Sequence, residues 1–390
     1  MKKVTIGFIG SGFVTGLHMW GYNKVSGIDV KIKAVASRKD EVTEAFVKKH
    51  GIQDVYEDYL EMLKDPEIDV IDICTPPFLH EEMVRNCLQA GKHVICEKPL
   101  TGYFGDPASD INVGEAVPKA KMLEEVTAEL NRIKEIADAC DKQFMYAENW
   151  VYAPVVQKSA EVIAAAKSKI LYMYAVEGHN GSHAHHAANW KFNGGGALIR
   201  QGCHPLAAAL FLKQVEAKAR GEVIKPVSVI ADCGVSCETL TDAERTQIDS
   251  HPVDVEDIAN VIITFSDGTK AHIMAGDMLV GGMRNSLDVY TNNSVHHCKM
   301  NPNDNMMVYH ADGTGLDDVY FAEKLGTKLG WQYVGINEEI QRGYAGEMQD
   351  FMECVAENRR PLADINIAYD ATKIVYAAYQ SAAEGRRIEL

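Results

Sequence analysis

Hydrophobic and polar positions follow a strand–helix rhythm over the first 148 residues. Short apolar runs predict buried strands at 4–9, 32–36, 70–74, 93–96 and 144–148. Stretches of helical period lie between them, after residue 12 and at 42–50, 59–64, 81–90 and 119–140. This alternation predicts an α/β fold with a doubly wound parallel sheet, a Rossmann domain over residues 1–148, whose ligand lies beyond the carboxyl ends of the strands.

The pattern changes at residue 149. Strand-like runs now follow one another closely, at 169–177, 227–233, 260–266, 270–275 and 286–291. Asp267-Gly268 between two of them is a hairpin signal. We therefore expect a second, α+β domain over residues 149–390, with a large, mostly antiparallel sheet. It ends in two helices, at 346–357 and 367–384, which we expect to pack back on the first domain.

Composition excludes several classes of function. The chain has 390 residues, 46% of them hydrophobic, and a net charge of −16, which argues against a nucleic-acid or anionic-membrane surface. No apolar run approaches the length of a membrane span. The apolar amino end runs into a glycine turn where a signal peptide would need its cleavage site, and the nine cysteines lack CxxC spacing. These features predict a reduced, cytoplasmic protein without a zinc site.

The first turn predicts a dinucleotide site. Gly10 permits a tight turn, and Gly12 lets the backbone approach a pyrophosphate at the amino end of the helix that continues with Phe13 and Val14. The third glycine of the fingerprint is replaced by Thr15, but the motif lies between a strand and a helix, as it should.

The end of the second strand bears on the choice between NAD and NADP. An NAD site usually offers an acid here for the ribose 2′-hydroxyl, whereas this chain has Ser37 and Arg38 followed by Lys39. A hydroxyl with basic neighbours suits a 2′-phosphate. The alternative, which is almost as well supported, is that these basic side chains lie in solvent over the adenine. The sequence thus predicts NAD or NADP, leaning weakly to tolerance of NADP.

Lys98 follows the strand at 93–96 and is the candidate base. At the carboxyl end of a parallel strand it can accept an alcohol proton while hydride leaves the carbon. The alternative is a structural pair with Glu97. Residues 101–118, rich in Gly, Asp and Pro, leave the sheet just after Lys98 and predict a flap over the site, or else a solvated insertion without a role.

Further polar and aromatic residues of the second domain are candidate substrate contacts. A histidine-rich stretch contains His179 and His183 and comes before Trp190. Metal binding by this stretch is disfavoured because it lacks HExxH spacing and a carboxylate, so we assign no metal. Its polar donors either bind sugar hydroxyls or are merely exposed. Trp150 and Tyr152 either stack on a sugar or nicotinamide ring or pack in the core.

Four segments together resemble the Gfo/Idh/MocA family of sugar oxidoreductases along nearly the whole chain. They are the glycine turn, residues 74–80 (CTPPFLH), 96–100 (CEKPL) and 194–204 (GGGALIRQGCH), joined by terminal segments at 347–351 and 376–382. The resemblance implies that Lys98 is the catalytic lysine and that Glu97 lies close to the nicotinamide. It also implies a cofactor groove lined by Thr75, Pro76 and His80.

The resemblance further implies that His204 hydrogen-bonds the reacting hydroxyl. Many members carry an aspartate four residues before that histidine, where this chain has Arg200. Arginine is not a base at neutral pH, so Lys98 and His204 must together carry out the proton transfer. Arg200 either holds an anionic or polyhydroxylated substrate or faces outward.

Within the family, the insertion after Lys98 and residues 148–154 resemble the branch of puerarin-type glycoside 3-dehydrogenases. The predicted reaction is NAD(P)-dependent oxidation of a secondary hydroxyl, C3 of a sugar or glycoside. The alternative is a redox-neutral enzyme that forms a 3-keto intermediate transiently and eliminates the aglycone, with His179, His183 or Tyr152 as the extra base. A non-catalytic regulator is disfavoured because Lys98 and His204 are both present. The family also implies a homo-oligomer formed through the large sheet.

Overall fold

The computed structural model describes residues 2–106, 108–182 and 184–390. Its first sheet has the order β3-β2-β1-β4-β5-β6, and every neighbouring pair is parallel. The strands are β1 (Lys2–Ile9), β2 (Ile28–Ala36), β3 (Asp54–Tyr56), β4 (Val70–Ile73), β5 (His93–Glu97) and β6 (Phe144–Ala147). The predicted Rossmann sheet is therefore confirmed, and the end of β5 delivers Glu97 and Lys98 to its ligand-binding edge.

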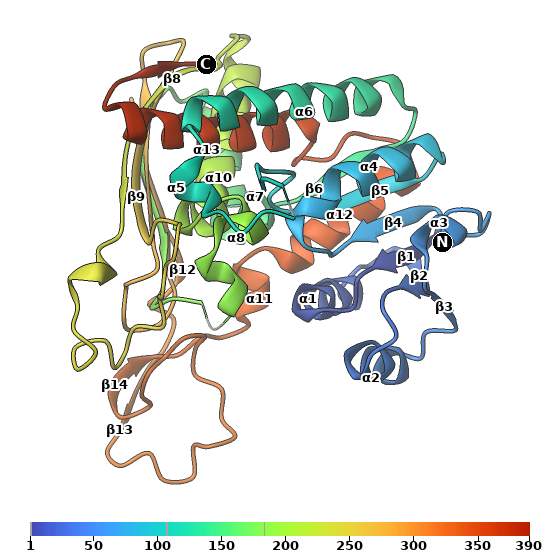
Figure 1. The fold of residues 1–390 in the computed structure, drawn as a ribbon, viewed down its shortest axis with the longest axis horizontal. Helices are drawn as coiled ribbons and strands as arrows, with labels where there is room; N and C mark the ends of the chain where they lie inside the picture. Colours follow the sequence, from blue (N-terminus) through green and yellow to red (C-terminus); the bar gives the residue numbers. More distant parts are fainter. Residues whose placement is uncertain (1, 107, 183) are drawn as a thin grey trace.

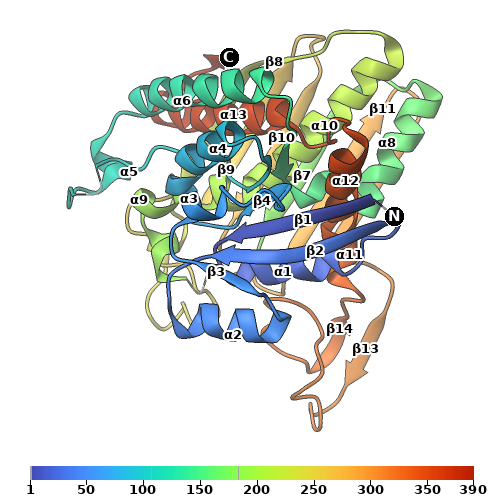
Figure 2. The same ribbon diagram turned by 90° about the vertical axis from the view of Figure 1, so that its right-hand side faces the viewer.

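Helices connect these strands and cover the sheet (Figure 2). They are α1 (Phe13–Tyr22), α2 (Glu41–His50), α3 (Tyr59–Met62), α4 (His80–Gln89), the short α5 (Val113–Ala116) and α6 (Lys119–Ala139). Local chemistry sets their ends. The Asp40 side chain caps α2 by accepting the Thr43 N–H, and Gly51, with a left-handed φ of +63°, ends that helix.

The second sheet has the order β12-β11-β7-β10-β9-β8-β15. Its strands are β7 (Ile170–Gly178), β8 (Pro226–Gly234), β9 (Ile258–Phe265), β10 (Lys270–Gly276), β11 (Arg284–Thr291), β12 (Val295–Asn301) and β15 (Ile388–Glu389). β7 and β10 run parallel and the other neighbours are antiparallel, as predicted. The hairpin at Asp267-Gly268 is present between β9 and β10.

Helices of the second half pack on one side of this sheet (Figure 1). They are α7 (Asn149–Tyr152), α8 (Pro154–Ala166), α9 (Trp190–Asn193), α10 (Cys203–Arg220), α11 (Glu338–Gln341), α12 (Tyr344–Glu357) and α13 (Ile365–Glu384). α13 packs between α6 and β8, and α12 packs against α1. The two terminal helices thus join the halves of the molecule and hold the candidate site between them.

A projecting arm interrupts the chain between β12 and α11 (Figure 1). It contains the antiparallel pair β13 (Met307–His310) and β14 (Gly330–Tyr333), which sequence analysis did not predict. Among the helices that the structure describes, none is both long and apolar enough to cross a membrane.

Candidate active site

A groove of about 550 Å³ runs along the carboxyl edge of the first sheet. Among its lining residues are six of the predicted cofactor contacts, namely Gly10, Gly12, Ser37, Arg38, Thr75 and Pro76. Phe13 and Val14 begin α1 next to this groove, with the Phe13 side chain exposed. The structure therefore brings the glycine turn, the end of β2 and the end of β4 to one elongated site of a size suited to a small-molecule cofactor.

Gly10 shows why this turn requires glycine. Its φ is +100°, a conformation rare for other residues, and a Cβ atom would lie 2.4 Å from the carbonyl oxygen of Cys74. Gly12 precedes the first residue of α1, and a Cβ there would meet no atom within 4 Å. The space beside Gly12 is open to the groove, so a pyrophosphate can approach the backbone and the amino end of α1 there.

Hydroxyl groups line the adenosine end of the groove. Ser37 Oγ lies 3.1 Å from Ser11 Oγ and 3.2 Å from the Thr43 hydroxyl. Arg38 lines the groove beside them, and so do Asp40 and Glu57. Asp40 follows the strand too late to take the usual position of the ribose-binding acid, and its carboxylate already caps α2.

His80 lies behind the groove and does not line it. Its Nδ1 is 2.8 Å from the carbonyl oxygen of Pro99, and its Nε2 is 2.9 Å from that of Thr75. The ring is fully buried. His80 thus ties the loop after β4 to the loop after β5, which positions Thr75 and Lys98 relative to each other.

Lys98 crosses from the first half of the molecule to the second. Its Nζ donates a hydrogen bond of 2.6 Å to the backbone carbonyl of Arg200. Residues 198–202 form a π-helical turn that runs directly into α10, the helix that bears His204. The lysine therefore contacts the backbone of this turn four residues before His204.

His204 is hydrogen-bonded to the carboxylate of Glu148. The contact is made through Nδ1 of the ring, and both side chains are buried. Burial raises the pKa of Glu148 and lowers the pKa of His204. The pair consequently favours its uncharged forms, and the contact to Nδ1 leaves Nε2 as the atom that can meet a substrate hydroxyl.

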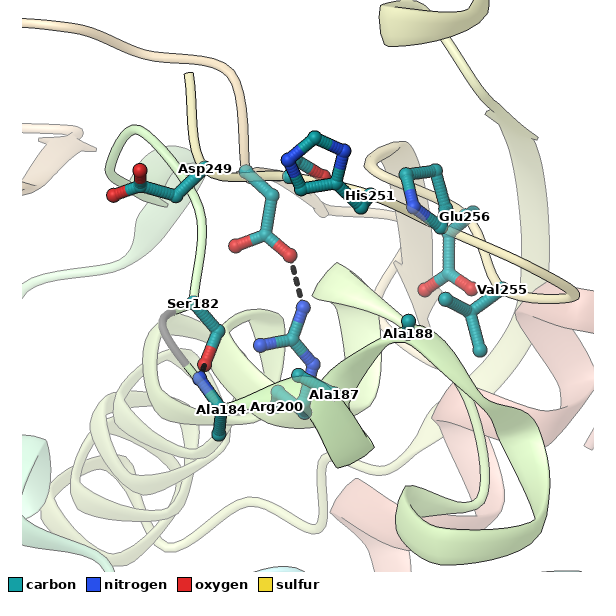
Figure 3. Close-up of a pocket in the computed structure, with 12 residues that line it drawn as sticks. Ser182, Ala184, Ala187, Ala188, Arg200, Asp249, His251, Val255 and Glu256 are labelled. Carbon is teal, nitrogen blue, oxygen red and sulfur yellow. Dashed lines mark hydrogen bonds and ion pairs between the residues drawn. The ribbon is translucent and has the colours of Figure 1, made fainter. Parts of the chain in front are cut away.

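Arg200 connects Lys98 to a polar cavity of about 260 Å³ (Figure 3). Its guanidinium forms an ion pair with Asp277, which also accepts from the side-chain amide of Gln201. Ser182, Asp249 and Glu256 are among the other lining residues. The cavity wall therefore offers donors and acceptors side by side, and the charge of Arg200 is already matched.

The fold places the other predicted substrate contacts in different parts of the molecule. His179 lies next to this region, with Nδ1 accepting the Gly181 N–H at 3.0 Å, and burial lowers its pKa to about 4. Tyr152 lies in the core, where its hydroxyl donates to Asp350 at 2.9 Å and accepts the Ala363 N–H at 3.0 Å. This placement favours the packing interpretation of Tyr152. His183 lies outside the described residues.

Trp190, in the second half of the molecule, is hydrogen-bonded to Tyr103 of the insertion at 101–118. Its Nε1 donates to the carbonyl of Tyr103 at 2.9 Å, while the Tyr103 N–H donates to the hydroxyl of Tyr376 at 2.6 Å. The Trp190 ring is buried and packs against Tyr379 with centroids 4.8 Å apart. The described part of the insertion is thus anchored between the halves, and Trp190 serves as an anchor within the protein.

Several important residues were missed by sequence reasoning. Glu148 was recognised only as the end of a strand, although an acid at the carboxyl end of β6 was an available signal. His18, which contacts Glu97, and Asp72, which contacts His18, lie inside a helix and a strand, and their spacing in the sequence gave no signal. Asp277 follows β10 directly, but its pairing with Arg200 depends on tertiary structure.

Two clusters in the described residues have ligand atoms close enough for a metal, within 4.8 Å of one another. They are His18-Asp72-Cys74 and Glu148-Cys203-His204, and neither includes a member of the 179–186 stretch. In both clusters the histidine is already hydrogen-bonded to a buried carboxylate, His18 to Asp72 and His204 to Glu148.

Comparison with known proteins agrees with this geometry. Residues 4–117 match the model of the GFO_IDH_MocA oxidoreductase family with an NAD-binding Rossmann fold. Residues 166–294 match the GFO/IDH/MocA C-terminal domain, so that the two models together cover more than half of the chain. The chain belongs to the Gfo/Idh/MocA oxidoreductase family.

Curated proteins of different activity are similar to this chain. A trans-1,2-dihydrobenzene-1,2-diol dehydrogenase of Bos taurus is 32% identical over 196 residues, 50% of this chain and 50% of that protein. A levoglucosan dehydrogenase of Pseudarthrobacter phenanthrenivorans is 33% identical over 107 residues, 26% of this chain and 27% of that protein. The matches thus span half or less of the length of these curated relatives.

The fold of the family extends over the whole chain. The crystal structure of GenD2 from gentamicin A biosynthesis, in complex with NAD, superposes with a TM-score of 0.77 and 20% identity. The superposition covers 100% of this chain and 97% of GenD2.

We predict that Gly10→Ala weakens NAD⁺ binding at least about tenfold, because its methyl group would collide with the Cys74 carbonyl and displace the turn. Gly27→Ala is the matched control, since Gly27 also has a positive φ (+77°) but open space around it. Calorimetric titration of both variants with NAD⁺ checks this. Equal affinities for the two variants would contradict the role of the close approach at Gly10.

Proposed function

We propose that the chain is an NAD(P)-dependent dehydrogenase that oxidises a secondary hydroxyl, C3 of a sugar or glycoside. The observation that carries this proposal is the convergence of Lys98 and His204, from opposite halves of the molecule, through the Lys98–Arg200 hydrogen bond. The bound nicotinamide would accept the hydride. Proteins similar to the chain include a levoglucosan dehydrogenase and a myo-inositol 2-dehydrogenase, which supports this class of substrate.

Lys98 and the His204–Glu148 pair divide the proton chemistry in this proposal. The Nζ of Lys98 holds its position by donating to Arg200, and in its neutral form the amine can still accept the proton of a hydroxyl. Glu148 orients the imidazole through Nδ1, so that Nε2 faces the reacting oxygen. Once Glu148 is ionised it stabilises a proton on Nδ1, which leaves Nε2 free to accept one.

The Arg200–Asp277 pair favours a neutral polyhydroxylated substrate over an anionic one. An unpaired guanidinium in this cavity would attract a carboxylate or phosphate, but Asp277 neutralises it. An array of adjacent donors and acceptors instead matches vicinal hydroxyl groups, each of which donates and accepts. The substrate contacts that we propose are Arg200 and the neighbouring His179.

The decisive experiment identifies both cofactor and product. Nicotinamide released from denatured protein is identified first, and Ser37 and Arg38 lead us to expect that NADP⁺ is accepted as well as NAD⁺. Native protein is then incubated with either nucleotide and a panel of inositols, hexoses and glucosides. We predict a keto product formed in step with reduced nicotinamide, and a loss of about 100- to 10,000-fold in kcat for Lys98→Met with nucleotide binding retained.

Other outcomes of that experiment are equally informative. Free aglycone without accumulated reduced nicotinamide would contradict net oxidation and favour the redox-neutral elimination. Unchanged turnover by Lys98→Met would contradict the role of Lys98. Absence of both nucleotide binding and turnover in the wild-type protein would overturn the proposed function.

The Glu148–His204 pair predicts a pH dependence. Burial raises the pKa of Glu148 to about 8, so below that pH the pair keeps an extra proton and Nε2 of His204 cannot accept another. We expect kcat/KM for oxidation to rise as the pH increases through about 8. Glu148→Gln should lose this rise and lower kcat/KM by on the order of 100-fold. A variant profile that keeps the same rise would assign the titration to another group.

The open face of the second sheet supports the proposal of a homo-oligomer. Helices pack on one side of the sheet, while the other side carries Ile230, Ile262, Tyr172 and Tyr290, all more than a third exposed. Ile230 and Ile262 are register partners, as are Tyr172 and Tyr290, so these side chains form two apolar pairs on this face, with Lys270 and His272 of β10 between them.

We predict that the wild-type protein is a dimer or larger and that Ile262→Lys shifts it toward monomer, because a lysine in the sheet face would have to be desolvated. Light scattering coupled to size-exclusion chromatography measures the mass. Val223→Lys is the control, since Val223 is 81% exposed and lies outside the sheet. A monomeric wild-type protein, or equal masses for both variants, would contradict this interface.

A further inference from the structure

Three buried side chains form a chain of contacts beneath the end of β5. His18, on α1, lies between two carboxylates, with Nδ1 2.9 Å from Asp72 and Nε2 3.0 Å from Glu97. The other carboxylate oxygen of Glu97 accepts the backbone N–H of Lys98 at 3.0 Å. His18 and Asp72 are fully buried, and Glu97 is almost so. We call these three residues the buried trio.

The buried trio carries one net negative charge whichever way its protons are arranged. Each ring nitrogen faces a carboxylate oxygen, so two protons must occupy the two contacts. Either His18 is an imidazolium between two carboxylates, or it is neutral and one carboxyl group is protonated. Burial lowers the pKa of His18, but polar contacts, first among them the neighbouring Asp72 carboxylate, outweigh burial and the pKa is raised. Burial raises the pKa of Glu97, but polar contacts, first among them the hydrogen bond from His18, outweigh burial and the pKa is lowered.

Stability alone gives no reason for this arrangement. Asp72 interrupts β4, whose other residues are Val70, Ile71 and Ile73, in the middle of the sheet. Burying ionised groups is costly, and apolar residues of similar volume in place of a buried ion pair are often as stable or more so. Asp72 also receives a hydrogen bond of 2.7 Å from the hydroxyl of Tyr22, which holds it toward His18. Side chains from α1 and β4, His18 and Asp72, thus place charged groups beneath Glu97.

We propose that the buried trio holds a fixed negative charge beside the nicotinamide and so makes the protein bind the oxidised cofactor more tightly relative to the reduced one. This inference rests on the proposed placement of the nicotinamide next to Glu97. The oxidised ring carries a positive charge that is lost when it accepts hydride, and a fixed charge acts strongly where water is excluded. None of the three residues lines the groove, but Glu97 contacts the backbone of Lys98, so Asp72 and His18 act through Glu97 as positioning residues.

A preference for the oxidised cofactor would favour one direction of the reaction. A protein that favours the oxidised ring binds NAD⁺ ready for reaction and holds the reduced product less tightly. Release of the reduced cofactor is often a slow step in dehydrogenases, and weaker binding would hasten it. The buried trio therefore suits net oxidation with release of the reduced cofactor.

The ratio of two dissociation constants tests this inference on the full-length protein. The Kd values of NAD⁺ and NADH are measured by calorimetry for the wild type and for the double variant Asp72→Asn/Glu97→Gln, which removes both carboxylates while keeping their shapes. We expect the ratio Kd(NADH)/Kd(NAD⁺) to fall by about tenfold, because a charge effect acts on one oxidation state only. Tyr22→Phe, which removes a hydrogen bond to Asp72 but no charge, should leave the ratio as in the wild type.

Each outcome has a distinct meaning. Glu97→Gln alone should shift the ratio in the same direction, and it decides the question if the double variant does not fold. Variants that bind both nucleotides with the wild-type ratio would overturn the inference. A wild-type protein that binds neither nucleotide would instead overturn the proposed function on which the inference rests.

Discussion

The hydrogen bond from Lys98 Nζ to the carbonyl of Arg200 is the contact on which the rest of the site depends. The carbonyl belongs to the π-helical turn of residues 198–202, which runs directly into α10. Through this bond the end of β5 meets the start of the helix that bears His204. The lysine that follows β5 and the turn that leads into α10 therefore define one site between them.

Buried acids surround this contact and divide its electrostatics into two parts. Glu148 controls the protonation of His204 on the substrate side. On the other side, Glu97 contacts both His18 and the backbone N–H of Lys98, and in our proposal it holds a negative charge beside the nicotinamide. Both acids are almost completely buried, so their fields are weakly screened by solvent and reach the reacting atoms. The polar groups that would be costly in an ordinary core are concentrated where charge changes during hydride transfer.

Much of the fold could be predicted from the sequence, because the strand–helix rhythm before residue 148 and the hairpin at Asp267-Gly268 are local signals. The glycine turn and its groove were predictable for the same reason. The partners of the site residues were not. Glu148 meets His204 across 56 positions and His18 meets Glu97 across 79, and such contacts arise only when the helices pack. The core position of Tyr152 likewise depends on α12, which lies about 200 residues further along the chain.

The central claim is that hydride passes from a carbon of the substrate to the nicotinamide at the point where Lys98 and His204 converge. Its most direct test uses a glucoside that carries deuterium at C3 and is incubated with native protein and NAD⁺, after which proton NMR locates the label. We expect deuterium at C4 of the reduced nicotinamide. Deuterium released to water, or retained at C3 while the cofactor becomes reduced, would contradict it.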